Sequence, residues 1–119
     1  MPLRFSVQTT ATGTVYLRVD AEGVVEEQDS LALVARLESH RGGKVLSVTA
    51  SNTEFRPAAR RIFLQIDAAE FSAIAAVVAS PVVQAATNLI LRFKRDSSVQ
   101  VFRSLDEALA WLDAQPSAK

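Results

Sequence analysis

Three arginines near the middle of the chain have a spacing that suits a binding patch. Arg60 and Arg61 follow Arg56 by four and five positions, so a helix would bring the three side chains close to one another. Guanidinium groups pair well with carboxylates and phosphates. The arginines could therefore bind an anion or the acidic surface of a partner protein. The competing interpretation is an ordinary solvated helix face.

The remaining polar residues offer little for catalysis. His40 is the only histidine, and at an expected helix end its cation would complement the helix dipole. A catalytic base needs a nucleophile or an acid nearby, and no such pair is recognisable. Asp67 and Glu70 lack metal-ligand spacing and are interpreted as a polar turn. Because cysteine is also absent, we expect no enzyme activity, no cofactor, and no catalytic or metal site.

Ser51, Asn52 and Thr53 form a short polar segment with two interpretations. These residue types favour turns and caps because their side chains bond to nearby backbone groups. The segment could also be a regulatory loop, since a phosphate at a helix N-terminus meets free N–H groups and a favourable dipole. Both interpretations remain open from the residues alone.

Three apolar residues are candidates for an interaction surface. Trp111 lies at the flank of an apolar stripe, where it could anchor a partner or simply close the rim of the core. Val83 and Leu91 lie off the main stripe of their expected helix. An exposed apolar patch there would favour a homodimer.

Composition limits the class of protein. The chain has 119 residues, 49% of them hydrophobic, which suits one domain at 1–115 with a loose tail at 116–119. Its 13 basic and 13 acidic residues cancel, so no positive field would attract nucleic acid. The first residues do not resemble a secretion signal, and no stretch is long enough to insert in a membrane. We therefore expect a cytoplasmic protein.

Hydrophobic periodicity and turn residues predict a single α/β domain with a mixed sheet. The expected order is β-β-α-β-α-β-α-β-α, opening with a hairpin that turns at Thr12-Gly13. Strands are expected at 3–9, 14–20, 44–50, 71–79 and 99–104, and helices at 31–40, 55–67, 81–95 and from 105 onward.

Two of these elements have predicted faces. In strand 14–20 the solvent-exposed face is expected to carry Tyr16, Arg18 and Asp20. In helix 31–40 the apolar stripe is expected to consist of Leu31, Val34, Ala35 and Leu37. Strand 71–79 is uniformly apolar, so we expect it to be covered on both faces.

The last 40 residues carry the clearest local signals. Ser80-Pro81 marks one helix start, and Ser104 with Glu107 forms the capping box of another. The element order, and especially the run VFRSLDEALAWL, resembles the STAS-like domains of the sulfate-transporter and anti-sigma-factor-antagonist superfamily. The chain looks closest to small stand-alone bacterial proteins of that fold.

This resemblance implies a regulatory or protein-interaction role. In signalling members, a partner kinase phosphorylates a serine or threonine after the central strand, a position that corresponds here to 47–53. The chain departs from the signalling pattern because no aspartate lies between Lys44 and Asn52. We therefore expect a non-enzymatic interaction module that binds a protein partner or a second copy of itself. The alternative is a carrier of a lipid or small apolar molecule, with an apolar cleft beside strand 71–79.

Overall fold

Five strands form a mixed sheet in the order β1-β2-β4-β6-β7. The computed structural model describes residues 2–67, 70–78 and 99–116. β1 is antiparallel to β2, whereas β2, β4, β6 and β7 are parallel to their neighbours. The strands are β1 (Leu3–Thr9), β2 (Val15–Ala21), β4 (Lys44–Thr49), β6 (Ala73–Val78) and β7 (Val99–Phe102). The predicted mixed α/β sheet is confirmed.

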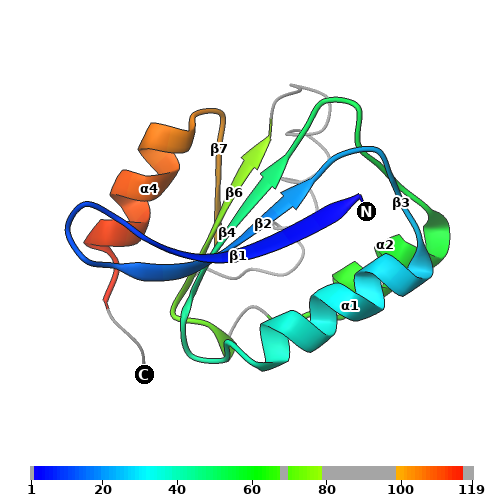
Figure 1. Ribbon diagram of the computed structural model, residues 1–119, viewed down its shortest axis with the longest axis horizontal. Helices are drawn as coiled ribbons and strands as arrows, with labels where there is room; N and C mark the ends of the chain where they lie inside the picture. Colours follow the sequence, from blue (N-terminus) through cyan, green and yellow to red (C-terminus); the bar gives the residue numbers. More distant parts are fainter. Residues whose placement is uncertain (1, 68–69, 79–98, 117–119) are drawn as a thin grey trace.

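The two faces of the sheet carry different helices (Figure 1). The helices α1 (Glu27–Glu38) and α2 (Pro57–Leu64) cover one face, and α4 (Leu105–Ala114) packs on the other. A short parallel pair, β3 (Val24–Val25) and β5 (Glu54–Phe55), precedes the two helices and was not predicted. The predicted helix 81–95 lies outside the described residues.

Local signals account for the helix starts. At α1 the backbone N–H of Glu26 donates to Asp29 Oδ2 at 2.9 Å, which satisfies one unpaired group of the first turn. Pro57 is the first residue of α2, where its missing N–H costs nothing. At α4 the N–H of Glu107 donates to Ser104 Oγ at 3.5 Å, so Ser104 is the cap that the sequence predicted.

The predicted apolar stripe of α1 is only partly correct. Leu33 and Leu37, four positions apart, face the sheet and are buried. Leu31 is 54% exposed. It lies two positions before Leu33, and two positions correspond to more than half a turn around the helix axis, so Leu31 points away from the buried face. Ala35, also expected in the stripe, is exposed. The side of the helix that carries Leu31 and Val34 therefore lies beside the core instead of facing it.

The prediction that one face of β2 is exposed to solvent is wrong at one end of the strand. Tyr16 is only 4% exposed because the core beneath α4 extends over it. Further along the same face, the half-buried Arg18 and Asp20 form an ion pair at 3.1 Å. On β6, Ala73 and Ala75 are fully buried under α4, while Ile74 packs on the opposite core. This strand is therefore covered on both faces, as predicted.

Two polar contacts tie the end of α4 to distant parts of the chain. The buried ammonium of Lys44, at the start of β4, donates to the carbonyls of Leu112 at 2.5 Å and Gln115 at 2.9 Å. In the turn between β1 and β2, Thr10 Oγ1 donates to Asp113 Oδ1 at 2.7 Å. In the described part of the chain, no helix is long and apolar enough to cross a membrane.

Candidate functional site

An open groove lies between α1 and α2. It has a volume of about 310 Å³. Its apolar walls are formed by Leu31, Val34, Leu37, Ile62, Ile66 and Phe71. Leu31 stands at the open side, where half of its surface reaches solvent. We call this feature the α1–α2 groove.

The two helices that form the groove are held together by a close polar contact. Ser30 Oγ donates to the carbonyl of Ala59 at 3.1 Å, and neither residue has any exposed surface. Two small side chains let the helix backbones approach at this point, and the larger aliphatic residues of the groove lie further along both helices. The contact therefore fixes the spacing of the groove walls.

One end of the α1–α2 groove is acidic. Glu38, Asp67 and Glu70 line it, and none of the described lining residues is basic. Arg41 lies beside this end, with its guanidinium 3.5 Å from the Glu38 carboxylate and 2.8 Å from that of Glu70. Both α1 and α2 also end here, so the negative ends of two helix dipoles add to the carboxylates.

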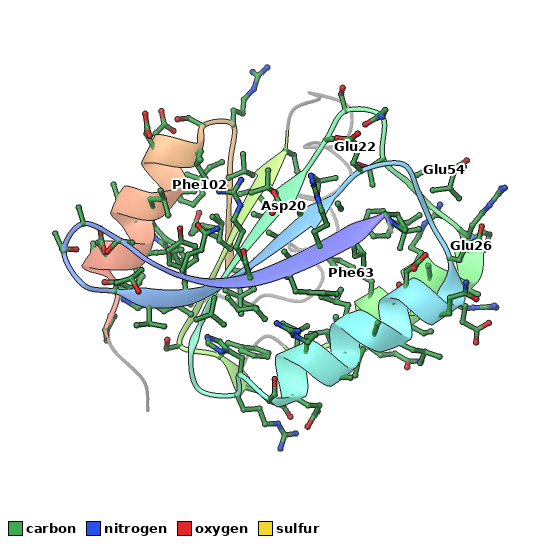
Figure 2. All side chains as sticks on the ribbon, in the orientation of Figure 1. Asp20, Glu22, Glu26, Glu54, Phe63 and Phe102 are labelled. Carbon is green, nitrogen blue, oxygen red and sulfur yellow. The ribbon has the colours of Figure 1, made fainter. Side chains whose placement is uncertain are left out.

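Of the predicted arginine patch, Arg56 lies at the opposite end of α2, whereas Arg61 is in the last turn of this helix. Arg56 precedes the helix and contacts Glu26 at 3.6 Å and Glu54 at 4.0 Å. Figure 2 shows Glu26 and Glu54 at this end of the molecule, where α1 and α2 begin. Arg60 donates instead to the carbonyl of Phe55 at 3.3 Å. Arg56 and Arg60 therefore have different neighbours, while Arg61 is exposed.

The predicted regulatory loop does not lie at a helix N-terminus. Ser51 and Asn52 are exposed in a turn, but β5 intervenes before α2 begins at Pro57. Thr53 is half-buried, and its Oγ1 donates to the carbonyl of Ala21 at 2.9 Å. Thr53 thus performs the turn and capping role, and Ser51 presents the exposed hydroxyl of this loop.

The other candidate residues have structural neighbours. The ring of His40 lies against Gly43, where an added Cβ would come within 2.8 Å of it. Glu70 is paired with Arg41, and the described residues contain no cluster of three metal-ligating side chains. Trp111 packs at the rim of the core beside Phe102, with ring centroids 5.7 Å apart. Val83 and Leu91 lie outside the described residues.

The sequence interpretation missed the α1–α2 groove. Leu31 and Val34 were assigned to the core, and Ile62 belonged to a segment compatible with either helix or strand. One signal was available, because Leu31 does not fit the four-residue spacing of Leu33 and Leu37. The expected cleft beside strand 71–79 differs from this groove, which receives only Phe71 from that strand.

Comparison with known proteins supports the same architecture. A family model described as SpoIIAA-like matches residues 16–113. Among solved structures, the chain is similar to an uncharacterised protein of the DUF3478 family from Shewanella loihica PV-4, described as having a SpoIIAA-like fold. That match has a TM-score of 0.73 and 19% identity, and covers 92% of this chain and 93% of the other. No curated protein matches the chain.

Proposed function

Because the chain belongs to the SpoIIAA-like family, we propose that it is a non-enzymatic protein-interaction module that binds its partner through the α1–α2 groove. Domains of this family generally bind protein partners. Within the described residues, the observation that carries the proposal is the exposed side chain of Leu31 beside an apolar groove. Aliphatic side chains around a concave surface supply the area that a partner can bury.

Site-specific photo-cross-linking tests this proposal. A photoreactive phenylalanine analogue placed at Leu31 should capture a protein partner in cells of the native host. The matched position is Val15, the first residue of β2, which is similarly exposed at 53%. The start of β2 lies by the hairpin turn, away from α1 (Figure 1). Capture should disappear when Ile62→Arg blocks the groove. Equal capture from both positions, or none from position 31, would contradict the proposal.

The loop at Ser51–Thr53 is the proposed regulatory element of this module. Ser51 is the accessible hydroxyl, whereas the Thr53 hydroxyl is already bonded to the backbone. Phosphorylation should therefore occur at Ser51 in preference to Thr53. Phosphosite mapping on protein from its native host measures this, and a loop that is unmodified under all growth conditions would remove the regulatory role.

A small-molecule carrier is the second candidate, and the volume of the α1–α2 groove favours it. Ligand pockets begin at about 300 Å³, which this groove reaches. Native mass spectrometry of the purified protein should then detect a bound lipid or small apolar molecule. The Ile62→Arg variant should lose that mass. A ligand retained by the variant would place binding elsewhere.

A further inference from the structure

We propose that the outer edge of β1 pairs with β1 of a second copy of this chain, so that two antiparallel edge strands join two sheets into one. This surface is separate from the α1–α2 groove, and the inference does not depend on the proposed function. β1 is seven residues long and forms the edge of the sheet beside β2. In Figure 1 it lies in front of the other strands of the sheet.

The backbone of β1 presents hydrogen-bonding groups at this edge. The carbonyl of Pro2 accepts from the N–H of Glu22 at 2.9 Å, and the N–H of Thr10 donates to the carbonyl of Thr14 at 2.8 Å. Because antiparallel pairing alternates along a strand, the even-numbered residues of β1 direct their backbone groups toward β2 and the odd-numbered residues direct theirs outward. Within the described part of the chain, no hydrogen bond reaches the outward groups. The outward-facing residues are Leu3, Phe5, Val7 and Thr9.

β1 also lacks features that commonly prevent edge strands from pairing. Lysine, proline and β-bulges are typical protections. The strand LRFSVQT contains neither lysine nor proline, and its register with β2 is unbroken from Leu3 to Thr9. β2 and β4 separate β1 from β6 and β7, the strands before and after residues 79–98, which lie outside the described residues. Among the described elements, the edge of β1 is therefore open to another strand.

The residues of β1 suit pairing with a second copy of the same strand. A two-fold axis at Ser6 keeps all seven residues in register and places every outward-facing residue opposite an outward-facing residue of the partner. Val7 then lies opposite the partner's Phe5. Val7 is 59% exposed in the single chain, and Phe5 is half-buried against the core beneath α1. Pairs of a β-branched and an aromatic side chain across two strands stabilise a sheet.

Charge is compatible with a second copy as the occupant. Arg4 is the only charged residue of β1, and in this register it faces the neutral Gln8 of the partner subunit. The two Arg4 residues lie about 13 Å apart along the strands, since they are four positions apart. Arg36, which lies over the Phe5 ring at 5.3 Å, is exposed, so solvent and salt screen its charge. The 13 basic and 13 acidic residues of the chain balance, so two copies carry no net charge that would repel them.

Cysteine cross-linking tests the register, because the chain contains no cysteine of its own. Across the proposed axis the two Ser6 residues form a non-hydrogen-bonded pair with Cα atoms about 4.5 Å apart, which is within disulfide range. Ser6→Cys should therefore give a covalent dimer on mild oxidation, measured by non-reducing gel electrophoresis. Gln8→Cys is the matched control, since position 8 is on the same face and more exposed but lies four positions from its own copy. Equal or faster cross-linking at position 8 would overturn the inference.

Sedimentation equilibrium measures the association of the unmodified chain, and we expect a dimer at micromolar concentrations. Val7→Lys should raise the dissociation constant of this dimer about ten-fold, because both pairs of Val7 with the partner's Phe5 are lost. Val15→Lys adds the same charge at a similarly exposed position of β2, one strand away from the edge, and should leave the constant unchanged. Far-UV circular dichroism checks that both variants are folded. A monomeric wild type, or an equal effect of the two variants, would overturn the inference.

Discussion

At the scale of single residues, the structure lowers the pKa of the Asp113 carboxyl group. Hydrogen bonds from the side chains of Thr14, Thr10 and Thr12 lower the pKa of its carboxyl below the ordinary value of 3.8. These threonines belong to the turn between β1 and β2. The charged carboxylate therefore holds that turn against the end of α4.

The lowered pKa predicts a stability difference that depends on pH. A carboxyl group whose pKa is lower in the folded than in the unfolded state stabilises the fold at pH values above its unfolded pKa. This stabilisation is lost as the pH falls through the folded pKa. Asp113→Asn should therefore destabilise the protein at pH values well above 3.8, and the difference from the wild type should shrink below that value. Urea unfolding on both sides of this value measures the effect.

A neighbouring threonine pair provides the control for Asp113. Thr10→Val removes a donor to the carboxylate, so it should reproduce part of the pH-dependent loss. Thr9→Val changes an exposed residue of β1 that has no contact with Asp113 among the described hydrogen bonds, and it should leave the pH dependence unchanged. An identical pH profile for Asp113→Asn and the wild type would refute the role of this carboxylate.

At the scale of elements, Lys44 determines how α4 is attached. Its buried ammonium donates to two carbonyls at the end of the helix, where a cation also complements the dipole. Lys44→Met should lower the free energy of unfolding by about 1–3 kcal/mol, because two acceptors lose their partner. Arg103→Met, at an exposed position, is the control. Urea unfolding measures both variants. A Lys44→Met variant as stable as the wild type would show that the contact contributes little.

The contact between α1 and α2 is the second test at this scale. Ala59 is fully buried where its carbonyl accepts from Ser30, so a larger side chain there would push the helices apart. We expect Ala59→Leu to cost about 1–3 kcal/mol through overpacking. Ala35→Leu, at an exposed position of α1, should have little effect. Ala59→Leu should also weaken binding in the α1–α2 groove, since the groove walls would move.

At the scale of the whole molecule, one sheet joins two separate cores. The core with α1 and α2 lies on one face, and the core with α4 lies on the other. Because every strand between them contributes to a shared hydrogen-bonded sheet, we expect residues 1–115 to unfold as one cooperative unit. Trp111 reports from the α4 side only, which makes this expectation testable.

Two leucines of α1 test the cooperativity. Leu33→Ala creates a cavity in the core beneath α1 and should cost about 2–5 kcal/mol. Its effect on the unfolding midpoint should be the same by Trp111 fluorescence as by far-UV circular dichroism. Leu31→Ala, two positions earlier and exposed, should cost much less. A transition that Trp111 does not share would show that the two faces unfold separately.

The fold was largely predictable because its signals are local. Strand alternation, the proline at the start of α2 and the Ser104 cap depend on residues a few positions apart, and such patterns identify elements and their order. The short β3–β5 pair could not be predicted, since two-residue strands carry no periodicity. Its presence is also why Ser51 lies away from the start of α2.

The amino-acid sequence by itself determined the order of the five strands of the main sheet and of the helices α1, α2 and α4. Only the tertiary structure decided that Leu33 and not Leu31 enters the core, that Lys44 reaches the end of α4, and that a groove lies between α1 and α2. The physical reason is the range of the interactions. Caps and periodicity depend on near neighbours, whereas burial and charge pairing depend on elements that are distant in the chain and meet only after folding.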